Sequence, residues 1–269
     1  MKIFNKIIVI SLISLLILMV SCYSSEDVPE GNIVETSEFT QKLLLEDYTG
    51  TWCPNCPRAA RAIENAVANN NRFIPVGIHF YTNTNIEEMQ NEYSSAIVNE
   101  YHPEGGFPIV ELNRQETVWA GDYVVATLEA MLNRYALVGL AINSSLNGNF
   151  IDVNVKVGFV EENSTVDNYK LVVFLLESGM VYPQQDGGEE VEDYEHENVL
   201  RYAFTSVFGD AVPNQIASDH RYSKDFIEVE LPTSIENSNN LKLVAFVLDK
   251  NNNCLNVQVA NIGENKDFD

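Results

Sequence analysis

Two cysteines separated by two residues are the part of this 269-residue chain best suited to chemistry. Cys53 and Cys56 follow an apolar run at residues 43–45 and precede apolar residues at helical spacing, namely Ala59, Ala60, Ile63, Ala66 and Val67. The pair is therefore predicted to lie between a buried strand and the start of a helix. A helix N-terminus lowers the pKa of a nearby thiol, and the thiolate is the form that attacks disulfides. We expect an exposed Cys53 to attack and a more buried Cys56 to resolve the mixed disulfide.

The residues around this pair resemble those of thioredoxin-like proteins over residues 43–135. Trp52 matches the tryptophan before the first cysteine, and Asp47 matches a buried acid that handles the proton of the resolving cysteine. Glu46 stands beside Asp47, so either carboxylate could face inward. Pro108 lies where that fold places a cis-proline, which packs against the redox pair and helps to hold an extended substrate; the cis form before proline carries little energetic cost. The resemblance implies a site made of Cys53, Cys56, Asp47, Trp52 and Pro108.

The sequence departs from thioredoxin around the helix start. Pro54 and Asn55 stand between the cysteines in place of Gly-Pro, and this dipeptide affects redox poise in the family. Pro57 has no N–H and favours a helix start, so regular helix could begin only there, which would weaken the dipole effect at Cys53. The direction of electron transfer therefore stays open.

A zinc site is the competing interpretation of the cysteine pair. Structural zinc takes four Cys or His ligands, usually as two close pairs, and the sequence has no second pair. Cys254 stands alone, either as a small residue at the start of a strand or as a third redox thiol. We therefore expect no metal and no other cofactor.

The N-terminal residues predict export and a lipid anchor. A short positive segment precedes an apolar run at residues 7–20, which is short for a membrane span but typical of a secretory signal. The segment resembles a bacterial lipoprotein signal in which Cys22 becomes the lipidated N-terminus; an ordinary cleaved signal is the main alternative, and an uncleaved membrane anchor is the other. We expect residues 1–21 to be a signal peptide and residues 22–36 a polar tether, bound to the membrane through the lipid on Cys22.

The charged residues bear on where the protein is located and on which partners it can bind. An acidic run at residues 24–27 resembles the surface-export signal of Bacteroides-group lipoproteins and points to the outer membrane, on its periplasmic face or at the cell surface. The chain has 39 acidic against 16 basic residues and a net charge of −23. Such a surface argues against nucleic acid as a partner, because nucleic-acid binding depends on Lys and Arg contacts to phosphate.

The hydrophobic pattern divides the remaining chain in two. Up to residue 136, strand and helix patterns alternate, which is typical of an α/β layer structure. Together with the resemblance, this predicts a thioredoxin-like domain over residues 37–136.

From residue 137 onward, short strands separated by Asn-rich turns predominate. Strict alternation with less apolar residues, as in a half-buried strand, is shown by Ile151, Val153, Val155 and Val157. We expect residues 137–269 to form a β-sandwich of immunoglobulin-like architecture. Within it, residues 182–222 are expected to be a long insertion with an acidic stretch and a possible short helix.

Two further runs resemble the 28-kDa outer-membrane-protein family of Bacteroides-group bacteria. One extends from Glu46 to Cys53 and continues at residues 58–60, and the other covers residues 196–201. With the β-rich second half, the resemblance spans nearly all of the chain after the signal. It implies an outer-membrane lipoprotein and leaves the mechanism open.

Two functions from different classes fit these features. The first is a lipid-anchored thiol–disulfide oxidoreductase of the cell envelope that acts on thiols or disulfides of exported proteins. The second is a non-catalytic binding or assembly protein in which Cys53–Cys56 is a structural disulfide and the β-sandwich contacts another envelope protein. Fold alone does not decide between them.

Overall fold

A computed structural model describes residues 38–82, 87–101, 106–119, 125–160, 168–213 and 220–269. The chain from Thr36 to Asp269 forms one compact unit. The predicted signal peptide and tether, Cys22 included, lie outside the described residues. Among the helices of the described part, none is both long and apolar enough to span a membrane.

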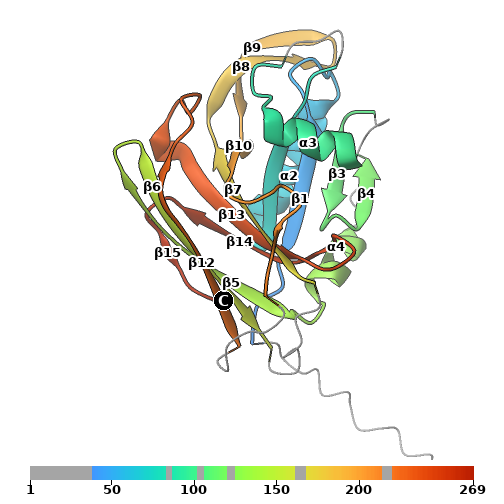
Figure 1. Cartoon of the computed structure of the whole chain (residues 1–269). Helices are drawn as coiled ribbons and strands as arrows, with labels where there is room; N and C mark the ends of the chain where they lie inside the picture. The colour runs from blue at the N-terminus through green and yellow to red at the C-terminus, as the bar shows by residue number, and fades with distance from the viewer. Residues whose placement is uncertain (1–37, 83–86, 102–105, 120–124, 161–167, 214–219) are drawn as a thin grey trace, which may run out of the picture. The chain divides into compact units, whose positions relative to one another are not determined.

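The first half of this unit alternates strands and helices, as the sequence predicts. The elements are β1 (Leu43–Thr49), α2 (Cys56–Asn69), β2 (Phe73–His79), α3 (Glu92–Tyr101), β3 (Ile109–Leu112), β4 (Glu116–Trp119) and α4 (Val125–Leu132). Their strands lie in the order β2-β1-β3-β4, with β1 and β2 parallel and β3 antiparallel to both β1 and β4. A βαβ unit is thus followed by a ββα unit around β1 (Figure 1).

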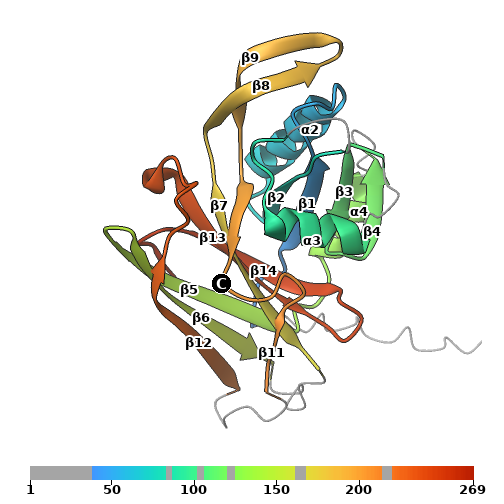
Figure 2. The same ribbon diagram turned by 45° about the horizontal axis from the view of Figure 1, so that its top comes forward.

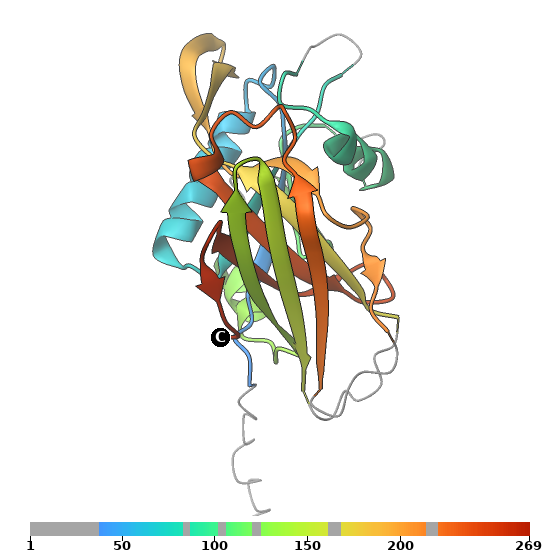
Figure 3. The ribbon, with the colours of Figure 1, turned by 60° about the vertical axis from the view of Figure 1, so that its left-hand side comes forward.

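Apart from a short 3-10 helix, η2 (Ser238–Asn240), the second half is made of strands. Four of them form an antiparallel sheet in the order β12-β6-β5-β15 (Figure 3), built from β5 (Val138–Asn147), β6 (Phe150–Phe159), β12 (Arg221–Glu230) and β15 (Asn265–Lys266). Five more join the sheet of the first half: β7 (Lys170–Glu177), β10 (Val199–Ala203), β11 (Asp210–Ala211), β13 (Leu241–Leu248) and β14 (Cys254–Asn261). The result is a mixed nine-stranded sheet with a second, antiparallel sheet against it.

One hydrophobic core joins the two sheets. The alternating valines of β6 and the facing residues of β7 and β13 belong to the same buried cluster. All four residues whose alternation the sequence singles out are at most 1% exposed: Ile151, Val153, Val155 and Val157. The predicted period-two strand is confirmed, because burial of every second residue is what that period produces.

The large sheet is continuous across the two halves at Gly77. There β2 pairs with β10 in parallel, and the Gly77 N–H donates to the Asn198 carbonyl at 2.8 Å. A Cβ at residue 77 would lie 3.3 Å from the Asn198 carbonyl oxygen. Glycine at this position therefore lets the second half of the chain approach the first.

Residues 182–222 differ from their sequence-based prediction. In place of an acidic insertion with a short helix, most of the segment is strand, beginning with a hairpin of β8 (Met180–Asp186) and β9 (Glu189–His196). The described residues of the segment contain no helix. Exposed acidic side chains along β9 hide the usual apolar signature of a strand, since the hairpin forms its own two-stranded sheet and buries little of β9.

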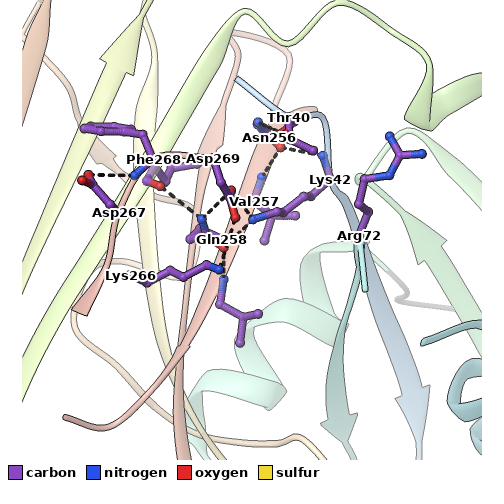
Figure 4. Close-up of polar contacts among 12 residues, drawn as sticks. Thr40, Lys42, Arg72, Asn256, Val257, Gln258, Lys266, Asp267, Phe268 and Asp269 are labelled. Carbon is purple, nitrogen blue, oxygen red and sulfur yellow. Dashed lines mark hydrogen bonds and ion pairs between the residues drawn. The ribbon is translucent and has the colours of Figure 1, made fainter. Parts of the chain in front are cut away.

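A hydrogen-bonded group fastens the start of β1 to β14 and to the last residues (Figure 4). The buried Lys42 Nζ lies 2.6 Å from Gln258 Oε1 and 2.5 Å from Asp269 Oδ1. The Lys42 N–H donates to Asn256 Oδ1, so the entry to β1 is held along the edge of β14.

A buried ion pair within the first half also contacts the second half. Arg114, in the turn between β3 and β4, donates two hydrogen bonds to Glu46 on β1, at 2.6 and 2.8 Å. Its guanidinium also donates to the Val207 carbonyl and lies 5.1 Å from the centre of the Phe246 ring on β13. Both side chains are at most 1% exposed. Because Val207 and Phe246 belong to the second half, residues of both halves surround the pair.

Replacing Arg114 with methionine is expected to destabilise the protein by about 3–5 kcal/mol, because the Glu46 carboxylate is left buried without a cation. The measurement is denaturant unfolding at neutral pH. The double variant Glu46→Gln/Arg114→Met removes both charges and should lose clearly less. Equal losses in the single and double variants would contradict this account.

Candidate functional site

Cys53 and Cys56 are joined by a disulfide with a Cα–Cα distance of 5.4 Å. The pair lies between the end of β1 and the first turn of α2, which begins at Cys56 with Pro57 next. Asn55 occupies the N-cap position without a side-chain hydrogen bond, and the first turn holds no acidic residue. The helix N-terminus therefore presents its positive end to the cysteine pair without a competing carboxylate.

Cys53 is buried, whereas the sequence predicts an exposed first cysteine. Only 2% of Cys53 and 1% of Cys56 is exposed. A segment far away in sequence is hydrogen-bonded to the CxxC loop, namely residues 184–187 at the tip of the β8–β9 hairpin. We call these residues the cover segment.

Four hydrogen bonds join the cover segment to backbone carbonyls of the loop. The Gln185 N–H donates to Thr51 at 2.8 Å, and the Gly187 N–H donates to Pro54 at 2.8 Å. The Gln184 side-chain amide donates to the carbonyl of Cys53 itself at 3.1 Å and to that of Gly50 at 3.4 Å. A surface ion pair between Arg61 of α2 and Asp186 adds a further contact at 2.8 Å.

A buried carboxylate is also hydrogen-bonded to the loop. Glu87 accepts hydrogen bonds from the N–H and the hydroxyl of Thr51, at 2.6 and 3.0 Å. His79, at the end of β2, lies 3.1 Å from the second oxygen of Glu87 through its Nδ1. Although burial acts to raise the pKa of Glu87, its contacts with His79 and Thr51 outweigh burial and lower it. Trp52 is fixed nearby, because its indole N–H donates to the Phe80 carbonyl at 3.0 Å.

Asp47 is the carboxylate that faces the helix side, which settles the choice between it and Glu46. It lines a cavity of about 50 Å³ together with Pro57, Gln184 and His196. Its Oδ1 is buried and has no hydrogen-bond partner among the described residues. Burial raises the pKa of Asp47 to about 7, from an ordinary value of 3.8.

The cavity wall opposite Asp47 comes from the second half of the chain. His196, at the end of β9, packs its ring 5.3 Å from that of His79 and 4.8 Å from that of Tyr194. Burial, and next the proximity of His79, lower the pKa of His196 to about 4. His196 is therefore neutral at physiological pH.

The Phe107–Pro108 bond is cis, the conformation that the sequence predicts. The next residue, Ile109, pairs with Tyr48 of β1, so Pro108 lies beside the strand end from which the CxxC loop departs. The Phe107 ring meets the Trp52 ring edge-on at 5.3 Å. Cys53, Cys56, Asp47, Trp52 and Pro108 are thus gathered at one end of β1.

Cys254 lies apart from this group. It is a free cysteine, 1% exposed, within the core cluster of the large sheet. Burial raises the pKa of its thiol well above the usual range, so it is a poor nucleophile at neutral pH. Over the described residues, no group of three or more His, Cys, Asp or Glu side chains is arranged to hold a metal ion.

Sequence reasoning missed the residues that complete the site: His79, Glu87, Gln184 and His196. Residues 196–201 carry part of the family resemblance, but nothing in them indicates contact with the redox loop. Gln184 lies 131 residues from Cys53, and no local periodicity reports a contact at that separation.

Asp47→Asn is expected to stabilise the oxidised protein at alkaline pH. Because its pKa is raised in the folded state, Asp47 favours folding in its protonated form. The free energy of unfolding of the wild type is therefore highest below about pH 3.8 and falls as the pH rises to about 7. Asparagine cannot ionise, and its advantage should grow over that window to at most about 4 kcal/mol. Denaturant unfolding from pH 3.5 to 8 checks this; a difference that does not vary with pH would contradict it.

The comparisons with known proteins give the fold and the family. No curated protein matches the chain. The structure of HBP35 of Porphyromonas gingivalis matches with a TM-score of 0.67 at 17% identity, over 86% of this chain and 78% of that chain. A domain of the outer membrane lipoprotein Omp28 of the same organism shares 22% identity over 48% of this chain and 91% of that chain, with a TM-score of 0.32. At these identities the HBP35 match shows a common fold and nothing more.

The family assignment rests on the sequence. The model of the outer membrane protein Omp28 family matches residues 84–266, about two thirds of the chain. The match begins after Cys53 and Cys56, so it does not depend on the cysteine motif. The chain therefore belongs to the Omp28 family of outer membrane proteins, the family and location that its sequence predicts.

Proposed function

We propose that this protein is a lipid-anchored thiol–disulfide oxidoreductase that acts on exported proteins. The observation that carries the proposal is the Cys53–Cys56 disulfide at an uncapped helix N-terminus, beside the buried and unpartnered carboxylate of Asp47. Perturbed titratable groups next to a reactive pair are typical of functional sites.

The strand order supports a thioredoxin-like first half. In that fold a parallel βαβ unit and an antiparallel ββα unit share one sheet, and the order β2-β1-β3-β4 follows this arrangement. The second half, with its two sheets packed face to face, is consistent with an immunoglobulin-like sandwich. The domain division near residue 137 would then separate two units that share the nine-stranded sheet.

The chemistry begins with a partner thiolate, which attacks the sulfur of Cys53. The Cys53–Cys56 bond breaks, a mixed disulfide forms, and Cys56 leaves as a thiolate. A second thiolate of the partner then attacks the mixed disulfide and releases Cys53. The partner loses two electrons and two protons and gains a disulfide, while this protein becomes the dithiol; the reverse sequence reduces a partner disulfide.

Asp47 is suited to the proton transfers of this cycle. A group whose pKa is about 7 exchanges a proton readily at neutral pH, and the cavity beside Asp47 reaches Pro57, next to Cys56. Trp52 and the cis-Pro108 would shape the surface on which the partner segment lies. The positive end of α2 would stabilise the Cys53 thiolate.

A structural disulfide remains the second candidate, and the burial of Cys53 favours it. In that case the β-rich half would bind another envelope protein. The two candidates differ in redox potential, since structural disulfides typically lie below about −300 mV and exchange-active ones above it.

Equilibration with glutathione buffers, followed by alkylation, is expected to give a Cys53–Cys56 potential less negative than about −300 mV. Cys56→Ala should also accumulate a mixed disulfide with a cysteine peptide supplied as its disulfide-linked dimer, because the Cys53 thiolate displaces one peptide thiol and no resolving thiol is present. Cys53→Ala is the matched control and should trap none. A potential below about −300 mV together with no trapped adduct would leave the structural disulfide as the explanation.

Lipid on Cys22 is the proposed membrane anchor, although that residue lies outside the described part. Cys22→Ser is expected to abolish labelling by radioactive palmitate and to release the protein from the membrane fraction. Cys254→Ser, which removes a buried thiol, should keep both the label and the membrane location. Retained label in Cys22→Ser would show that this cysteine is not the acylated residue.

A further inference from the structure

The cover segment blocks the path to the disulfide. Thiol–disulfide exchange requires a thiolate to reach a sulfur along the direction of the S–S bond, and at 2% exposure Cys53 offers no such path. Figures 1 and 2 show the β8–β9 hairpin arching over the start of α2, with its tip above the loop that joins β1 to α2. Any exchange with a partner protein therefore needs a different position of this tip.

The hairpin is packed at its base, whereas its tip is exposed on β9 and buried on β8 at Gln184. At the base, Met180 and Val199 are at most 2% exposed and share a buried cluster with Met89. Within the described part of the chain the hairpin pairs with neither of the other sheets, and β9 is exposed from Glu189 to Asp193. Movement of the tip would therefore leave the base packed.

The contacts between the tip and the loop are polar. They are the four hydrogen bonds to the loop, two of them from the buried Gln184 side chain, and the Arg61–Asp186 ion pair, whose side chains are 55% and 31% exposed. Exposed ion pairs contribute little to stability, and salt screens them. The hairpin is also flanked by residues in the left-handed region, Gly179 with φ of 71° and Asn198 with φ of 57°, where the chain turns sharply into and out of it.

We propose that residues 184–187 form a displaceable cover over the Cys53–Cys56 disulfide, and that the disulfide exchanges with thiols only when the hairpin tip lifts. Lifting frees the carbonyls of Thr51 and Pro54, which become acceptors for an extended segment of the partner beside its attacking cysteine. The role of this cover as a regulator rests on the proposed oxidoreductase function. The closure itself is testable with a small thiol.

Gln185 offers a substitution that removes one contact of the cover. Its N–H donates to Thr51 and not to β9, so Gln185→Pro deletes that bond and leaves the hairpin ladder in place. Proline already occurs in β8 at residue 183 and is tolerated at strand edges. Gln185→Ala is the matched control, because it keeps the N–H and removes only the side chain.

The measurement is the rate at which dithiothreitol reduces the disulfide in the full chain, purified in detergent under native conditions. Alkylation and peptide mass spectrometry report Cys53 and Cys56 separately from Cys254. Loss of one hydrogen bond shifts an opening equilibrium about two- to tenfold. Gln185→Pro should speed reduction by that factor while its free energy of unfolding falls by no more than the loss of one hydrogen bond, and Gln185→Ala should stay within twofold of wild type.

Two results would overturn the cover. One is equal reduction rates in Gln185→Pro, Gln185→Ala and wild type; the other is reduction that tracks global unfolding in all three. The test of the proposed function gives outcomes that are independent of the test of the cover. Faster reduction of Gln185→Pro supports the cover even if no peptide adduct is trapped on Cys53, and a trapped adduct with equal rates supports the enzyme without the cover.

Discussion

The site depends on one constraint: adjacent residues of β1 point to opposite faces of the sheet. Successive side chains of a strand point to opposite faces of the sheet, and β1 is buried along its whole length. Glu46 therefore points into one core, where Arg114 neutralises it, and Asp47 points to the other side, where none of the described residues brings a cation to it. The same strand thus carries one carboxylate that stabilises the fold and one whose proton affinity is raised beside the cysteine pair.

The far half of the chain is part of the site and not an appendage to it. β10 pairs with β2 next to Gly77, and this contact brings β8 and β9 over the start of α2. Gln184 and His196 then close the cavity that Asp47 lines. A fragment that ended near residue 136 would keep both cysteines but expose Asp47 to water, and its carboxyl would titrate nearer its ordinary pKa.

Much of this arrangement can be predicted from the sequence, because the patterns that indicate it are local. The cysteine spacing, the tryptophan, the proline at 108 and the alternation in β6 all reflect short-range geometry, and the elements and the cis bond they predict are present. The buried position of Cys53 could not be predicted, because Gln184 is 131 positions away in β8 and the partner strand β9 is acidic and lacks apolar alternation. The role of Glu87 could not be predicted for a related reason: a single carboxylate in a polar run does not indicate that it will be buried against Thr51.

The sequence distance between the loop and its cover has a consequence for biogenesis. An exported chain emerges from the membrane with its N-terminal residues first, so Cys53 and Cys56 reach an oxidising compartment before residue 184 does. The two thiols can pair while the neighbouring surface is still open. When the hairpin arrives and docks, it closes over a bond already made, so the order of emergence favours the oxidised protein as the product of synthesis.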